Sequence, residues 1–354
     1  MDVWEEERQF GAVRRAVQCL ACVSINFNGL AVYLILKYSP KHLSGYKFVL
    51  LNICMWSIIV DMHVAFVYLP MPHLEIVGAY STGLAGNFSP LIGFSMLMLM
   101  VYFLAGYLMS LGYGFVYRLL SVQNHPYLKT LNSRTGIAIL VVFHVVPPAA
   151  ICILPSTCYI PTEEYKAIVA ERHPESLVLF EKRPLFGSAF DKRPIILAVS
   201  IIVVYILLWF LVVSYCLLAI VAHMSKSRLF MSARTYRFHL QLFRALAVQT
   251  FLPTVLLLAP IIGILLGFVL QLPFHNALIE VAEIMFGVHS SINCFAMIVL
   301  ITPYRRAVLM VLNVVVDWID KKTNGHRRRT IVDTSASRVY FVSGVRQKEL
   351  SMVG

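Results

Sequence analysis

Charged residues are scarce in this chain: Asp, Glu, Lys and Arg make up 14% of its 354 residues, whereas 59% are hydrophobic. Because a soluble globular domain carries about 25% charged residues, this composition excludes an ordinary water-soluble fold. The net charge of +12 would suit nucleic acid only if the basic residues formed one face. They lie between apolar runs instead, so we expect no nucleic-acid partner.

Catalytic and metal-binding signatures are also missing. The sequence has no GxSxG, GxxxxGK[ST] or HExxH motif and no glycine-rich loop after a strand. Its seven cysteines do not form paired CxxC motifs, and all but Cys158 lie in apolar stretches, which excludes a disulfide framework. No apolar stretch carries the regular arginines of a voltage sensor. We therefore expect no enzymatic activity, no metal and no cofactor.

Long apolar runs are what the sequence has in abundance. Crossing a hydrocarbon core about 30 Å thick takes about 20 apolar residues in a helix. Seven stretches are long enough, and they predict an all-α membrane protein with a bundle of seven transmembrane helices over residues 16–301. The predicted spans lie near 16–37, 48–70, 91–117, 136–156, 195–222, 246–270 and 277–301.

The loop charges orient these spans, because Lys and Arg in short loops stay on the cytoplasmic side. The 37–47, 118–135 and 223–245 loops carry three, three and five basic residues and no acid. The 71–90 and 271–276 loops on the other side carry no Lys or Arg. We expect residues 1–15 to be extracellular, against the local signal of Arg14 and Arg15.

The same orientation puts the C-terminal tail, residues 321–354, in the cytoplasm. Before it, the apolar residues 302–320 are flanked by Arg305, Arg306, Lys321 and Lys322. This pattern favours an interfacial helix along the inner membrane surface.

Asp61 and His63 lie near the middle of the second span, where ionisable side chains are costly and face the bundle interior. They indicate a buried polar cluster, with Asn28 and Asn293 as further members. Two interpretations remain open. The cluster either holds water or an ion that stabilises one conformation, or it simply locks helices together.

Two groups of residues are candidates for a ligand pocket. Glu280 and Glu283 share a helical face in the outer third of the seventh span, where they either pair with a polar or cationic ligand or lie at headgroup level. The third span has Phe94, Ser95, Met98 and Tyr102, which suit an adaptable apolar pocket. The same side chains also fill ordinary helix interfaces.

Short motifs in a fixed order resemble the nematode serpentine chemoreceptors of the Str superfamily, especially the Srh and Sri classes. Ser39-Pro40-Lys41-His42 with Gly45-Tyr46-Lys47 is similar to the first inner loop, and Tyr117-Arg118 to the inner end of the third helix. The motifs also include Gln249, Pro253 and Pro260 of the sixth helix, and His289-Ser290-Ser291 and Pro303-Tyr304-Arg305 at the seventh. Together they cover roughly residues 20 to 310.

The resemblance implies a G-protein-coupled receptor for environmental chemicals, in the plasma or ciliary membrane of a sensory cell. Its expected partners are a small-molecule ligand, a heterotrimeric G protein and the lipid bilayer. On the G-protein side we expect Tyr117, Arg118, Arg237, Arg244, Tyr304 and Arg305. Positive-inside topology alone also accounts for these basic residues.

The chain departs from rhodopsin-like receptors in three ways, one of which is that the seventh helix exits through Thr302-Pro303-Tyr304-Arg305 instead of an Asn-Pro-x-x-Tyr run. Arg118 follows Val116-Tyr117, so it has no adjacent carboxylate, and the outer end of the third span has no cysteine to pair with Cys158. The alternative function is a polytopic transporter or channel that uses the intramembrane polar residues as a path, although no internal repeat supports it. Asn87-Phe88-Ser89 also matches an N-glycosylation sequon in a predicted outer loop.

Overall fold

The computed structural model describes residues 3–39, 45–73, 75–188, 192–228, 232–269 and 275–323. The chain up to Ala307 forms one compact unit, and Val308 to Gly354 form a second. The end of the predicted tail, residues 324–354, and residues 40–44 of the first inner-loop motif lie outside the described residues.

Seven helical stretches among the described residues are long and apolar enough to cross a membrane, which confirms the predicted seven-helix membrane fold. They comprise α1 (Val3–Tyr38), α2 (Tyr46–Met62) with the π-helical η2 (His63–Tyr68), α3 (Pro90–Val122), α5 (Arg134–Ser156), α8 (Lys192–Ser227), α9 (Ala233–Pro253) with the π-helical η5 (Thr254–Leu258) and α10 (Ala259–Val269), and α11 (His275–Leu300). A further helix, α12 (Thr302–Thr323), follows α11.

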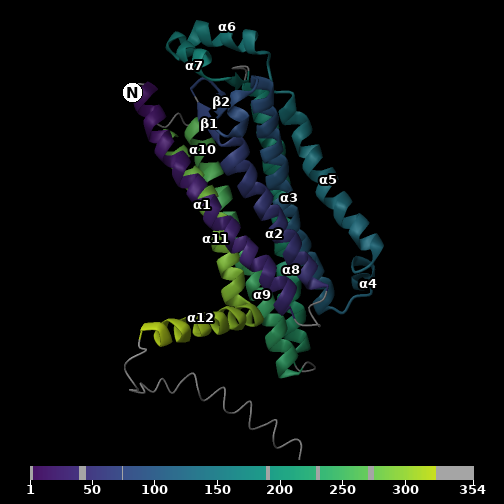
Figure 1. Cartoon of the computed structure of the whole chain (residues 1–354). Coiled ribbons are helices and arrows are strands. Elements are labelled where there is room, and N and C mark those ends of the chain that lie inside the picture. The colour runs from purple at the N-terminus through teal and green to yellow at the C-terminus, as the bar shows by residue number, and fades with distance from the viewer. Residues whose placement is uncertain are drawn as a thin grey trace, which may run out of the picture. The chain divides into compact units, whose positions relative to one another are not determined.

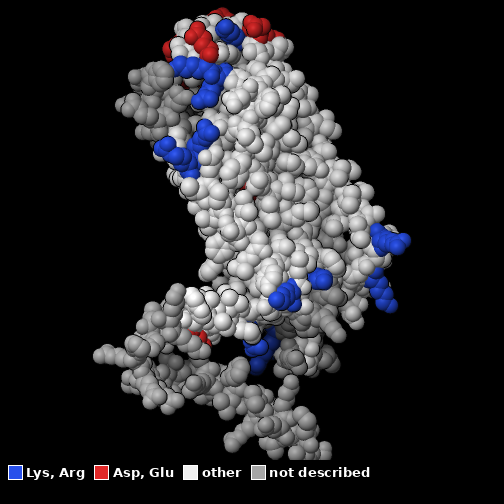
Figure 2. Space-filling view, viewed as in Figure 1, with Lys and Arg blue, Asp and Glu red and all other residues white. Residues whose placement is uncertain are grey.

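Helix α3 is the centre of the bundle, packing against α2, α5, α8 and α9. Helix α1 packs against α2 and α11, and α11 packs against α9 (Figure 1). The face shown in Figure 2 carries a broad belt nearly free of charged side chains, between Lys and Arg at one end and a mixed group of acids and bases at the other. Such a belt is what a hydrocarbon environment requires.

Local sequence determines where two of these helices begin. The Ser89 hydroxyl accepts a hydrogen bond from the Ile92 amide at 3.4 Å, and Pro90 occupies the first turn of α3. The Ser232 hydroxyl caps α9 in the same way, 3.2 Å from the Thr235 amide. Both arrangements satisfy otherwise unpaired amides. Helix α9 therefore begins 13 residues before the predicted sixth span.

Intramembrane prolines have two different outcomes. Helix α5 continues through Pro147 and Pro148 without interruption. At Pro253, by contrast, α9 ends and the wider turn of η5 follows before α10 resumes the α-helical winding. A proline lacks the amide donor of the α-helical ladder and kinks or breaks a helix, and π-helical segments occur mostly as single turns within α-helices.

One end of the bundle, here called the sheet end, carries secondary structure in the segments predicted as outer loops. Strand β1 (Pro70–His73) pairs antiparallel with β2 (Gly78–Ser81), and β2 pairs with β3 (Phe186–Gly187). The sheet end also contains η3 (Leu84–Asn87), α6 (Thr162–Arg172), η4 (Pro174–Ser176) and α7 (Leu177–Lys182). The opposite end, the Arg118 end, contains the short helix α4 (Tyr127–Leu131) between α3 and α5.

Tyr165 connects α6 to the three-stranded sheet. Its side chain is fully buried, and its hydroxyl donates to the Ile76 carbonyl at 2.9 Å. The ring lies over Gly78 and Gly187, which face each other across β2 and β3, and a Cβ at either glycine would overlap the ring. Burial raises the pKa of the Tyr165 phenol, so the hydroxyl keeps its proton and remains a donor.

Candidate functional site

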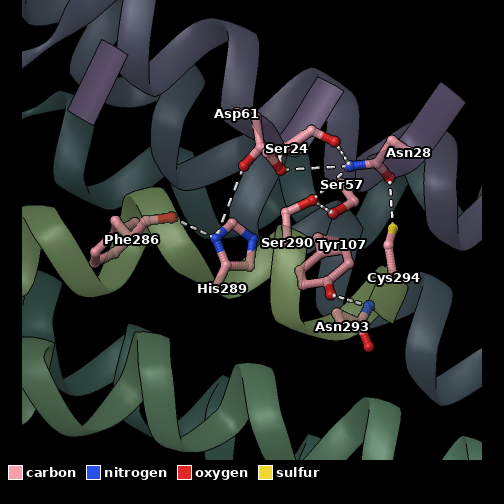
Figure 3. A network of polar contacts seen from close by, with 10 residues as sticks. All are labelled: Ser24, Asn28, Ser57, Asp61, Tyr107, Phe286, His289, Ser290, Asn293 and Cys294. Atoms are coloured by element: carbon pink, nitrogen blue, oxygen red, sulfur yellow. Dashed lines mark hydrogen bonds and ion pairs between the residues drawn. The ribbon is translucent and has the colours of Figure 1, made fainter. Parts of the chain in front are cut away.

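A buried polar network joins α1, α2 and α11 in the middle of the bundle (Figure 3). The Ser24 hydroxyl donates to Asp61 Oδ2 at 2.6 Å. The Asn28 amide donates to the Ser24 carbonyl at 3.0 Å and to Ser290 Oγ at 2.7 Å. The Ser57 and Ser290 hydroxyls lie 2.6 Å apart. Three helices distant in sequence are therefore tied together by side chains.

The imidazole of His289 closes this network from α11. Its Nδ1 atom lies 2.5 Å from the Phe286 carbonyl and 3.8 Å from Asp61 Oδ1. The His289 side chain is completely buried, and Asp61 is almost so. A buried carboxylate needs partners of this kind, because leaving water costs several kcal/mol for a lone ion.

The network continues to α3 and contains uncompensated atoms. The Asn293 amide donates to the Tyr107 hydroxyl at 3.1 Å, and the Cys294 thiol donates to Asn28 Oδ1 at 3.1 Å. His289 Nε2 and Asn293 Oδ1 are buried without a hydrogen-bond partner among the described residues. Since each such atom costs about 1–3 kcal/mol, this packing leaves energy to be gained by rearrangement.

Of the predicted polar cluster, the structure brings Asn28 and Asp61 together and puts Asn293 in the adjoining contact with α3. His63 lies apart, with Nε2 at 2.9 Å from the Met96 carbonyl, because residues two apart on a helix face different directions. Sequence reasoning did not select Ser24 and Ser57. Ser24 lies four residues before Asn28, and Ser57 lies four residues before Asp61. Residues at this spacing share a helical face, which is the sequence signal that could have identified both serines.

A cavity of about 520 Å³ lies at the sheet end of the bundle. Its wall is formed mainly by α3, α8, η5, α10 and α11, with residues of α1, η2 and α5 and the three strands completing it. Apolar side chains dominate this wall, among them Leu104, Leu108, Ile202, Leu257, Leu258 and Phe286. Its volume falls in the range of about 300–1,000 Å³ typical of small-molecule sites.

Three of the six predicted ligand residues line this cavity: Phe94, Met98 and Glu283. Ser95 is exposed, and its hydroxyl donates to the Leu91 carbonyl at 2.8 Å. Tyr102 donates to the His144 carbonyl at 3.2 Å, between α3 and α5. Glu280 is not part of the described wall, although it lies one turn before Glu283 on α11.

Cys158 adds a thiol to the cavity wall at the end of α5. Burial raises the pKa of this thiol, although a contact with Ser188 opposes the effect. The Ser188 hydroxyl donates to the Cys158 carbonyl at 2.6 Å. Because only the thiolate is a good nucleophile, Cys158 is a weakly reactive part of the wall at neutral pH.

Arg118 is buried at the other end of the bundle, only 2% exposed. One of its terminal nitrogens lies 3.0 Å from the His239 carbonyl and 3.3 Å from His239 Nδ1, on α9. The guanidinium also lies 5.4 Å from the ring centre of Tyr46 on α2. Arg118 thus holds α2, α3 and α9 together with no carboxylate among these contacts.

The other residues predicted for the G-protein side divide into two groups. Tyr117 and Tyr304 are buried: the Tyr117 hydroxyl donates to Asn132 Oδ1 at 3.0 Å, and the Tyr304 hydroxyl lies 2.8 Å from Ser39 Oγ. Burial raises the pKa of the Tyr304 phenol, so this contact remains a neutral hydrogen bond. The three remaining residues, Arg237, Arg244 and Arg305, are exposed.

Two further predictions concern the surface and metals. Asn87 is exposed at the end of η3, next to the helix cap formed by Ser89. In the described parts of the chain, no group of three or more His, Cys, Asp or Glu residues could hold a metal ion.

Comparison with known proteins identifies the family. No curated protein matches the chain. The family model for the serpentine type 7TM GPCR chemoreceptor Sri matches residues 14–308, a range that begins within α1 and contains the other six helical stretches, the cavity and the polar network. Of the two classes that the motifs resemble, the match is to Sri. The chain therefore belongs to the Sri family of serpentine seven-transmembrane chemoreceptors.

Proposed function

We propose that a small, largely apolar molecule binds the cavity at the sheet end and changes the packing of the bundle, so that the Arg118 end engages a heterotrimeric G protein. The observation that carries this proposal is the position of Phe286. Its side chain lines the cavity, and its carbonyl contacts the His289 imidazole of the polar network. One turn of α11 therefore touches both the ligand volume and the network.

A ligand can shift the packing only if it binds one packing more tightly than the other. In this proposal the polar network is the part of the bundle that adopts two arrangements. His289 Nε2 and Asn293 Oδ1 have no partner among the described residues in the present packing. A small rotation of α11, driven by contact with Phe286, would give these atoms new partners and alter the contact between His289 and Asp61.

The contacts of Arg118 support the proposal that the present packing is the resting state. His239 contacts the guanidinium through both its ring and its carbonyl, and Arg118 is almost inaccessible. A protein partner reaches Arg118 only after α9 moves away from α3. The exposed Arg237 and Arg244, on the same helix, would then flank the newly opened surface.

The role of the cavity as the ligand site is tested by filling it with a larger side chain. Ala198 on α8 lines the cavity and is 6% exposed, whereas Ala150 on α5 is exposed on the outside of the bundle. We expect Ala198→Phe to abolish nucleotide exchange driven by any active odorant, and the matched Ala150→Phe to preserve it. The assay is a panel of Gα subunits and apolar odorants. Responses that survive Ala198→Phe, or no response across a broad panel, would contradict the proposal; ligand-dependent flux in liposomes would favour a transporter.

We also propose that the sheet end and the N-terminus face outward, because the basic loops lie at the Arg118 end. Reporter tags inserted in the 157–194 loop and after Gly354 should then lie on opposite sides of the membrane. Glycan attachment at Asn87, lost in Asn87→Gln, would independently mark its loop as outer. Tags on the same side would refute this orientation.

For α12 we propose a position along the inner membrane surface. Its residues from Leu309 to Trp318 are exposed, and most are large and apolar. Asn313 and Asp317 lie four residues apart on one narrow polar stripe. Brominated lipids should quench more fluorescence in the wild type than in Trp318→Phe, and equal quenching would show that Trp318 stays in water.

A further inference from the structure

The cavity wall contains one acidic side chain and no basic one among its described residues. Two of its other polar side chains are already engaged. The Tyr205 hydroxyl donates to the Ala105 carbonyl at 3.0 Å, and the Ser188 hydroxyl donates to the Cys158 carbonyl. The Tyr68 hydroxyl and the Glu283 carboxyl are buried without a full set of partners among the described residues, and of these two groups Glu283 is the acid that can pair with a cationic ligand.

The Glu283 carboxyl is incompletely satisfied. Its Oε1 atom is buried and has no hydrogen-bond partner among the described residues. Glu280 lies one helical turn away on α11, so the two acids reinforce each other's negative potential. A buried acidic group of this kind is stabilised by a cation, and the described wall supplies none.

The remaining volume suits a compact apolar body. The cavity of about 520 Å³ is about three and a half times the size of an engineered apolar cavity of about 150 Å³ that admits benzene. Phe94 and Met98 on α3 face the same volume, together with aliphatic side chains of α8. Polarizable and aromatic side chains accommodate rings of varied shape.

We propose that this cavity selects small lipophilic amines: the protonated nitrogen pairs with Glu283, and the hydrocarbon body occupies the apolar wall between α3 and α8. This inference rests on the proposed function, which makes the cavity the ligand site. Bonds between ionised partners are about twice as strong as neutral ones and are strengthened in a water-poor site. A neutral alcohol of the same shape should therefore bind more weakly.

The test compares two probes of equal shape, 4-fluorophenethylamine and 4-fluorophenethyl alcohol, at neutral pH. Binding to the full-length receptor in lipid nanodiscs is followed by ¹⁹F NMR line broadening, which needs no G protein. The wild type should bind the amine about 10- to 100-fold more tightly than the alcohol. Glu283→Gln should remove this preference, Glu283→Asp should retain part of it, and the control Glu280→Gln should keep most of it.

Ala198→Phe separates this inference from the proposed function, because it fills the cavity without changing any charge. If it blocks both probes while the wild type binds them equally, the cavity is the ligand site and the amine preference is refuted. Binding of neither probe to the wild type would overturn both proposals. The wild-type comparison alone decides the preference, even if Glu283→Gln fails to fold.

Discussion

Removing the His239 imidazole should raise the receptor's activity in the absence of ligand. The ring and carbonyl of His239 share one terminal nitrogen of Arg118, at 3.3 Å and 3.0 Å. The substitution His239→Ala deletes the ring contact and leaves the carbonyl contact in place. It therefore weakens the connection between α3 and α9 without breaking it.

The expected size follows from this geometry. A hydrogen bond to a charged group contributes about 1.5–3 kcal/mol, and we take the lower value because the same nitrogen keeps its carbonyl partner. A loss of about 1.4 kcal/mol changes an equilibrium about tenfold. If the active packing is populated at about 1% without ligand, within the usual range for a minor state, it should rise to about 10%.

The measurement is nucleotide exchange by a coupled Gα subunit without ligand, with hydrogen exchange of the α9 amides as a readout that needs no G protein. His125→Ala, at the same end but without a contact to Arg118, is the matched control. Basal exchange and α9 protection that are unchanged in His239→Ala, in a receptor that folds normally, would refute a role for this contact in holding the resting packing.

Three other predictions concern the packing and the sheet end. Gly106→Ala brings a methyl group within 2.4 Å of the Trp56 ring, whereas the methyl group of Gly29→Ala meets no atom within 4 Å. Thermal denaturation in detergent should therefore show a free energy of unfolding lowered by about 1–3 kcal/mol in Gly106→Ala and unchanged in Gly29→Ala. Tyr165→Phe leaves a buried carbonyl without its donor and should accelerate hydrogen exchange in β2, with unchanged exchange as the contrary result. The raised pKa of the Cys158 thiol predicts slow alkylation at pH 7 that accelerates as pH rises past the ordinary thiol value, because the thiolate forms only there; a rate independent of pH would contradict it.

The seven-helix fold was predictable because length and apolarity suffice to identify a membrane span. The sheet end was not. Strands β1 and β2 contain Pro70, Pro72, Gly78 and Ala79, which have low strand propensity, and β2 also pairs with β3, which lies more than 100 residues later. Only the folded chain brings Gly78 opposite Gly187 and leaves room for Tyr165.

The candidate sites were predictable in part for a similar reason. Asp61 could be selected because a carboxyl in a membrane span is costly whatever surrounds it. Its partner Ser24, and Ser290, which accepts a hydrogen bond from Asn28, are inexpensive in any helix, so their role depends on how α1 and α11 pack against α2. The contact between Arg118 and His239 involves a backbone carbonyl, which the sequence alone cannot distinguish from any other.

The π-helical segment η5 has a consequence for the range of chemicals that this receptor recognises. A π-helical turn contains one more residue than an α-helical turn, so rewinding η5 would rotate the adjoining helix by about 100°. Leu257 and Leu258, both in the cavity wall, belong to this segment. Such a change would replace the side chains that line the cavity while every residue stays helical. Selectivity would then depend on helical winding as well as on amino-acid identity, and one sequence would offer two differently lined cavities.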